Sequence, residues 1–144
     1  MKTFKLKTET GTEIVRIIVN QYYTTGYIHI GLECLEDDEW VSYCDLTENF
    51  VEPLPVYWGY VSDNHAFDIK KFIKRIKLGE YQEGRSKRRG GTRYFLYKFN
   101  AERLRELCPE GVREYETSKE ETAEVEIIKQ KEEEQLVHMK CELF

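Results

Sequence analysis

One short basic segment holds the residues best suited to chemistry. Residues 85–93 contain five cations and no acid, and Gly90 and Gly91 interrupt the run. Guanidinium and ammonium groups bind phosphate oxygens, and adjacent glycines let a backbone approach closely. We therefore expect this segment, extended by one cation of the segment before it, to bind a partner or the backbone of RNA or DNA. The predicted binding residues are Arg85, Lys87, Arg88, Arg89, Arg93 and Lys74.

Aromatic residues behind this segment form a second candidate surface. A strand over residues 92–99 would place Arg93, Phe95, Tyr97 and Phe99 on one face. If that face were exposed, single-stranded bases could stack on it. Aromatic residues of strands more often pack into the core, so both interpretations stay open.

Residues 63–70 have the side-chain types of a metal-dependent nuclease. Asp63, His65, Asp68 and Lys70 would have to converge on one ion to act in that way. The segment instead has the pattern of a helix start, where acidic residues cap the first turn and balance the helix dipole. We therefore favour a structural role for these residues.

The cysteines do not have the spacing of a metal site. Gaps of 10, 64 and 33 positions separate them, whereas zinc ligands usually come in close pairs. We expect reduced thiols, although a disulfide could join the first two if their strands were neighbours. They are Cys34, Cys44, Cys108 and Cys141. No nucleophile or phosphate-loop motif is present either, and we expect no enzyme activity, cofactor or metal.

Composition and charge describe one globular chain with an uneven charge layout. The 144 residues include 22 basic and 27 acidic ones, and 40% are hydrophobic, which is enough for a core. Residues 1–50, 51–100 and 101–144 carry net charges of −5, +6 and −6. No stretch has the length of a membrane span or the pattern of a signal peptide. We expect a protein of the host-cell cytoplasm without a membrane partner.

The first 62 residues have the alternating, β-branched pattern of antiparallel strands. The clearest case is residues 27–35, where Ile28, Ile30, Leu32 and Cys34 share one face. The pattern predicts strands over residues 4–7, 13–23, 27–35, 40–46 and 57–61.

The hydrophobic period changes in the following segment. Apolar residues from Ile69 to Ile76 recur at helical spacing, Asp63 or Asn64 can cap this helix, and Gly79 can end it. Residues 80–91 have no apolar pattern and predict a flexible loop. A strand over residues 92–99 and a short helix capped by Asn100 follow. The pattern favours an α+β fold, an antiparallel sheet of about five or six strands with two helices on one face.

The C-terminal residues differ in composition. From Glu110 to Glu134 there are ten acidic and four basic residues, and the sequence that starts at Ser118 resembles a capping box. Residues 137–143 alternate in the manner of a strand. We expect a core domain over residues 1–109 and an acidic, helical C-terminal extension over residues 110–144.

Short motifs across residues 1–108 resemble a known family. They comprise residues 1–8 with 11–13, Ala66-Phe67, Phe72-Ile73, Leu78-Gly79-Glu80, Gly84-Arg85-Ser86 and residues 96–100. The resemblance is to a family of unknown function carried on Gram-positive conjugative and phage-like elements. This chain has a longer and more basic loop, and Phe95 stands where that pattern has a proline.

The resemblance implies a small accessory protein of mobile DNA. Such proteins are often inhibitors of host defence, including anti-CRISPR proteins, and usually act by binding. We therefore expect a non-enzymatic inhibitor that binds a CRISPR–Cas-type effector or its guide complex. Its basic segment would contact RNA or DNA, and its acidic surfaces would meet the effector's basic channel. The alternative is a nucleic-acid-binding accessory factor for conjugation or replication that acts through residues 85–93.

Overall fold

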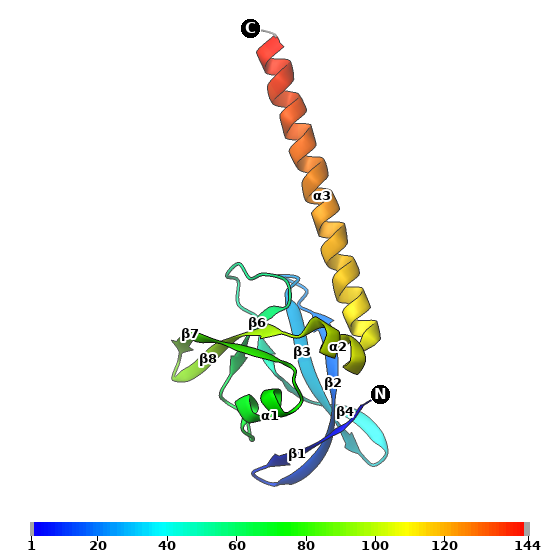
Figure 1. The fold of residues 1–144 in the computed structure, drawn as a ribbon, viewed down its shortest axis with the longest axis vertical. Helices are drawn as coiled ribbons and strands as arrows, with labels where there is room; N and C mark the ends of the chain where they lie inside the picture. The colour runs from blue at the N-terminus through cyan, green and yellow to red at the C-terminus, as the bar shows by residue number, and fades with distance from the viewer. Residues whose placement is uncertain (1, 143–144) are drawn as a thin grey trace.

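The computed structural model describes residues 2–142, with the side chains of residues 2–137. Within these residues, eight strands form two antiparallel four-stranded sheets, and three helices accompany them. The sheets and the two short helices form one body, from which the last helix projects (Figure 1). This arrangement confirms the predicted α+β class with a helical C-terminal extension.

The first sheet is a meander of β1 (Phe4–Thr8), β2 (Gly11–Gln21), β3 (Ile28–Glu36) and β4 (Glu39–Asp45), paired in chain order. Val15, Ile17 and Val19 of β2 lie on one face, opposite apolar residues of β3, and all are buried. The alternation in the sequence therefore marks the face that packs into the core.

The second sheet has the order β5-β6-β8-β7. Its strands are β5 (Thr47–Glu48), β6 (Trp58–Ser62), β7 (Gly79–Arg89) and β8 (Thr92–Phe99), and α1 (Ile69–Arg75) connects β6 to β7. Two further helices, α2 (Ala101–Leu107) and α3 (Pro109–Glu142), complete the chain. The strands therefore number eight in two sheets, where the sequence predicted five or six in one.

The crossover between the sheets is held by buried hydrogen bonds. The backbone N–H of Ile30 donates to Thr47 Oγ1 at 3.0 Å, and the N–H of Leu46 donates to the carbonyl of Ile30 at 2.8 Å. The Tyr22 hydroxyl donates to the carbonyl of Thr47 at 2.8 Å. Thr47 is fully buried, and burial raises the pKa of Tyr22 to about 12. One core of apolar side chains from both sheets and all three helices surrounds this crossover.

The prediction of a flexible loop over residues 80–91 is wrong. Residues 79–89 form β7, which pairs with β8 and carries a bulge between Tyr81 and Ser86. Because β7 is an edge strand, it needs little apolar surface, and charged side chains on such a strand prevent pairing with other chains. The hydrophobic pattern alone therefore does not reveal it.

The predicted ends of α1 are also wrong. Asp68 is the N-cap residue, and its carboxylate accepts a hydrogen bond from the N–H of Lys71 at 3.2 Å. The Asp63 carboxylate instead accepts from the N–H of Arg93. The helix ends at Arg75, ahead of Lys77 with a φ of 58°, and Gly79 begins β7. In contrast, the predicted Asn100 cap of α2 is confirmed.

The last helix starts earlier than the predicted capping box. It begins at Pro109, so Ser118 lies inside it, and it continues through the segment predicted to alternate as a strand. Once a helix has nucleated, Glu, Gln and Lys residues extend it at little cost, which explains the difference. Leu143 of that segment lies outside the described residues. None of the helices within residues 2–142 is long and apolar enough to cross a membrane.

A close backbone contact fixes where α3 crosses β2. A Cβ atom added to Gly111 would lie 2.1 Å from the carbonyl oxygen of Val19. Beside it, the N–H of Val19 donates to Cys108 Sγ at 3.4 Å. Only a glycine lets the two backbones approach in this way.

Gly111→Ala should therefore destabilise the protein. At an exposed helical position this change stabilises by up to about 1 kcal/mol, but here we expect the free energy of unfolding to fall by about 1–3 kcal/mol because the methyl group meets β2. Urea unfolding measures the change, with the exposed Thr117→Ala in the same helix as control. A variant as stable as the parent chain would contradict this seating of α3.

Candidate binding surfaces

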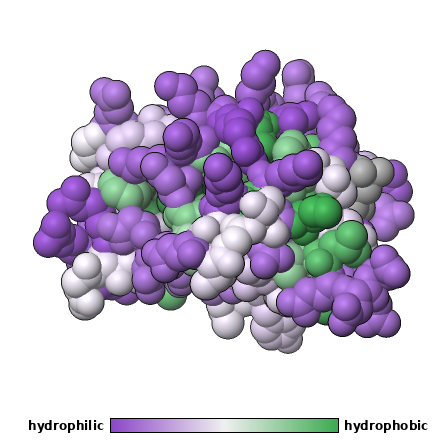
Figure 2. Space-filling view, turned by 90° about the horizontal axis from the view of Figure 1, so that it is seen from below, coloured by the Kyte–Doolittle hydropathy of each residue, from purple (hydrophilic) through white to green (hydrophobic). Residues whose placement is uncertain are grey.

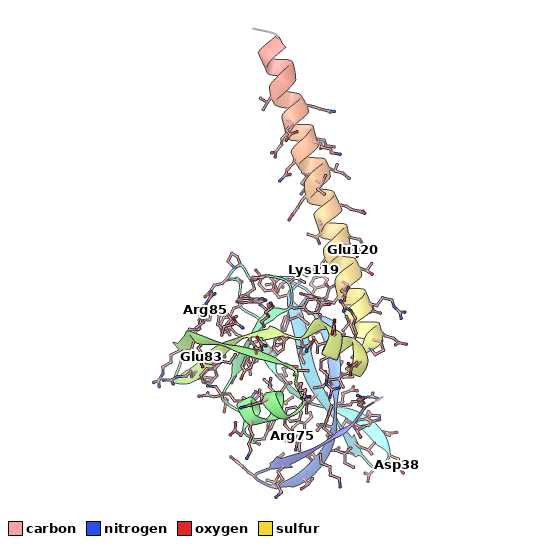
Figure 3. The ribbon with its side chains drawn as sticks, in the orientation of Figure 1. Asp38, Arg75, Glu83, Arg85, Lys119 and Glu120 are labelled. Carbon is pink, nitrogen blue, oxygen red and sulfur yellow. The ribbon has the colours of Figure 1, made fainter. Side chains whose placement is uncertain are left out.

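The hairpin of β7 and β8 divides the predicted basic segment between two faces. Lys87 lies opposite Tyr94, and Arg88 lies opposite Arg93. Because successive side chains of a strand point to opposite faces, Lys87 and Arg89 share one face and Arg88 takes the other. Arg85, labelled at the hairpin in Figure 3, lies over the Trp58 ring and so belongs to the face of Lys87. The segment is therefore not one continuous basic surface.

The face of Lys87 covers a small aromatic cluster. The Lys87 Nζ atom lies 3.8 Å from the Phe50 ring centroid and 4.2 Å from that of Tyr60. It also donates to Glu52 Oε1 at 2.5 Å, and this hydrogen bond lowers the pKa of Glu52. Arg89 lies over the same Phe50 ring, at 4.7 Å. With Arg85 over Trp58, three of the six predicted binding residues therefore already make contacts within the protein.

The other predicted residues remain accessible. Arg88 and Arg93 are exposed on the opposite face of the hairpin, and Lys74 is exposed in the last turn of α1. Among the described residues, no carboxylate lies within salt-bridge distance of these three.

Of the two interpretations left open for the aromatic residues of β8, the structure supports packing into the core and excludes an exposed stacking platform. Phe95, Tyr97 and Phe99 are 8%, 3% and 2% exposed and belong to the main core, and burial raises the pKa of Tyr97 to about 12. Lys70 of α1 lies over the Phe95 ring at 3.6 Å and closes the remaining access. These aromatic residues are buried because their face of the second sheet packs into the main core.

The residues with nuclease-like types do not converge. Asp63 bonds the backbone of Arg93, Asp68 caps α1, and Lys70 lies over Phe95. His65 is half-buried with its ring 5.2 Å from that of Phe67, and burial lowers the pKa of its imidazole. In the part of the chain that the structure describes, no three His, Cys, Asp or Glu side chains gather to hold a metal.

A basic groove that sequence reasoning missed lies between α1 and β1. A cavity of about 580 Å³ opens there, lined by Lys5 and Lys7 of β1 and by Lys71 and Arg75 of α1, with Phe67 beside them. Figure 2 shows this lower surface, where hydrophobic side chains come to view between hydrophilic ones. More than sixty positions separate the two sets of cations, so no local motif could have indicated the groove.

A network of hydrogen bonds anchors the base of α3. The N–H of Tyr57 donates to the Tyr115 hydroxyl at 3.1 Å, and the Tyr57 hydroxyl donates to Glu116 Oε1 at 2.5 Å. Arg105 donates to the same carboxylate at 2.9 Å. The hydrogen bond from Tyr57 lowers the pKa of Glu116, while burial raises the pKa of Tyr57. Lys119 then lies over the rings of Tyr27 and Tyr115.

Beyond Lys119 the helix leaves the body of the protein. Residues 120–137 are all exposed, and they include seven acidic and two basic residues. Figure 3 marks Lys119 and Glu120 at the point of departure. The apolar residues of this stretch, such as Val125, Ile127 and Val137, are at least half exposed and lie on different sides of the helix. We call residues 120–142 the acidic arm.

Substitutions in the hairpin should distinguish a cation that packs within the protein from one that is exposed to solvent. Lys87→Ala should lower the free energy of unfolding by about 1–2 kcal/mol, because the side chain covers two rings and pairs with Glu52. The exposed Arg88→Ala should change it by less than about 0.5 kcal/mol. Urea unfolding of both variants measures the difference. Equal effects would contradict the contacts of Lys87.

The hydrogen bonds of Glu116 that anchor α3 should stabilise the protein less at low pH. A carboxylate with a lowered pKa in the folded protein adds stability above its unfolded pKa and loses that contribution as pH falls through the folded pKa. Between pH 6 and pH 3, the parent chain should therefore lose more stability than Glu116→Gln. Urea midpoints at the two pH values measure this, with Glu124→Gln of the arm as control. An equal loss for Glu116→Gln and the parent would show that the hydrogen bond from Tyr57 does not stabilise the carboxylate.

One family model matches the chain over residues 17–119, and its description is "Domain of unknown function (DUF4313)". The match covers most of the two sheets, α1, α2 and the anchored base of α3. No curated protein and no solved structure matches the chain. The expected membership of a family of unknown function is thereby confirmed. The chain belongs to the family of the domain of unknown function DUF4313.

Proposed function

We propose that the protein is a non-enzymatic inhibitor that competes with nucleic acid for the basic channel of a host-defence nuclease. The observation that carries this proposal is the acidic arm, whose residues 120–137 are all exposed and have an excess of carboxylates. A channel that binds a phosphate backbone is rich in Lys and Arg and attracts negative charge.

The anchored base of α3 supports the proposal. The contacts of Gly111 with β2 and of Glu116 with Tyr57 and Arg105 hold the first turns against the body. The arm therefore starts from a fixed point and presents its carboxylates in a helical array. An array held in this way loses less conformational entropy on binding than a disordered acidic tail would.

The class of nuclease follows from the resemblance to proteins of mobile elements. Such elements meet nucleases of the CRISPR–Cas type, whose guide–target duplex lies in a positively charged channel. The arm is proposed to occupy part of that channel before the target enters.

A cleavage assay with purified, guide-loaded effector nucleases tests this. The parent chain should inhibit cleavage when added before target DNA, and inhibition should weaken as salt increases. Replacing Glu120, Glu121, Glu124 and Glu126 by Gln should raise the concentration needed for half-inhibition by about tenfold or more, since a tenfold change needs only about 1.4 kcal/mol.

The acidic turn between β3 and β4 offers a matched control. Neutralising Glu36, Asp37, Asp38 and Glu39 also removes four charges, and Asn tolerates the positive φ of 47° and 65° at the two aspartates. This variant should inhibit as well as the parent chain. Equal losses in both variants would show that net charge alone is responsible, and no inhibition of any effector would overturn the proposal.

The second candidate is the nucleic-acid-binding accessory factor. The exposure of Arg88 and Arg93, which lie opposite each other on the hairpin, favours it. In that case Arg88→Ala with Arg93→Ala should weaken binding of duplex DNA and flatten its salt dependence, while the neutralised arm should have no effect or strengthen binding.

A further inference from the structure

Hydrogen bonds at both ends hold the groove between α1 and the β1–β2 hairpin in place. At one end Arg75 donates a hydrogen bond from its guanidinium group to the carbonyl of Lys5. At the other end the N–H of Glu9 donates to the carbonyl of Ala66 at 3.1 Å. The hairpin and the segment that carries α1 are therefore tied on both sides of the cavity of about 580 Å³. This volume lies within the ~300–1,000 Å³ typical of small-molecule sites.

Positive charge dominates the lining. Lys5 and Lys7 line the cavity from β1, and Lys71 and Arg75 line it from α1. The carboxylate in the lining, that of Asp68, already accepts the hydrogen bond that caps α1. Among the described residues, no carboxylate forms a salt bridge with any of the four cations. The groove therefore has unneutralised positive charge on both walls.

An aromatic ring lies among these cations. Phe67 is half-buried and borders the cavity, and its ring packs edge-on against Phe72 at 5.8 Å between centroids. That packing holds the ring in place while part of it stays accessible. A fixed aromatic ring beside phosphate-binding cations is the arrangement with which proteins bind single-stranded nucleic acid, because the base stacks while the cations contact the backbone.

We propose that this groove binds a nucleoside phosphate unit, free or within a single strand, with the base stacked on Phe67 and the phosphate between the cations of β1 and α1. An anion alone would not explain the accessible ring, and an apolar ligand would not explain four cations that form no salt bridge among the described residues. The groove differs from the basic segment of residues 85–93, since its residues come from β1 and α1.

The site is independent of the acidic arm. In Figure 1, α1 and β1 lie at the end of the body opposite to the projecting part of α3, and Figure 3 labels Arg75 at that end. The two surfaces can be changed separately. Failure of nuclease inhibition would therefore leave this proposal intact, and failure of nucleotide binding in the groove would leave the proposed inhibition intact.

Fluorescence anisotropy with a labelled oligothymidylate of twelve nucleotides tests the proposal on the full chain. Lys5→Ala, Lys7→Ala and Lys71→Ala together should weaken binding at least tenfold. The slope of log affinity against log salt should fall by about 2, because each phosphate contact on a single strand contributes about 0.7. Phe67→Leu should weaken binding at least fivefold and leave the slope unchanged, because a stacked base is worth about 1–3 kcal/mol.

The matched control removes three exposed cations that lie outside both the groove and the basic segment. Lys98→Ala, Arg113→Ala and Lys129→Ala together should leave both affinity and slope near those of the parent chain. Melting temperatures within a few degrees of the parent establish that the variants fold. Unlabelled ATP separates the two sources: displacement at concentrations similar to unlabelled oligothymidylate assigns the groove to a free nucleotide, and weaker displacement assigns it to a strand.

Three results of the binding measurements would overturn the proposal. They are the absence of oligothymidylate binding in 50 mM salt, equal losses in the two triple variants, and an unchanged affinity of Phe67→Leu. Sedimentation velocity provides a further check, since the acidic arm of a second copy also has the charge to enter the groove. A dimer that the groove variant abolishes would assign the groove to self-association and overturn nucleotide binding.

Discussion

The hydrogen bonds around Thr47 are the constraint on which the rest of the molecule depends. The first sheet ends at Asp45 and the second begins at Thr47, whose hydroxyl and carbonyl are bonded to Ile30 and Tyr22. Because these groups are buried, each lost bond would leave a desolvated polar atom. The crossover therefore holds the two sheets at one relative position. α1, the β7–β8 hairpin and the base of α3 all pack on surfaces that this position creates.

The sequence predicted elements whose pattern reflects burial on one side. The strands of the first sheet, β6, β8 and α2 were predicted because their apolar residues face a single core. β7 was missed because its aromatic neighbours are covered by Lys87 and Arg89 rather than by apolar side chains of its own. A cation that lies over a ring cannot be told from a solvated one by its residue type.

The candidate sites were harder still to predict, because residue type does not show which cations contact the protein itself. The six cations predicted to bind are divided by the hairpin between two faces and α1, and two of them are engaged with Phe50 and Glu52. The cations of the groove were not predicted, because Lys5 and Arg75 meet only when the β1–β2 hairpin packs beside α1. Sequence reasoning located excess charge correctly along the chain. Which charges converge is a property of the tertiary fold.

The length of α3 beyond its anchor makes the helix a lever. At a rise of about 1.5 Å per residue, the 23 residues from Glu120 to Glu142 extend ~34 Å from the last contact with the body. A tilt of about 10° at the base would displace the tip by about 6 Å, which exceeds the rise of one helical turn. A change of one atom's size where Gly111 meets β2 is therefore magnified several-fold at the far end. The side chains in this small contact govern the reach of the whole helix.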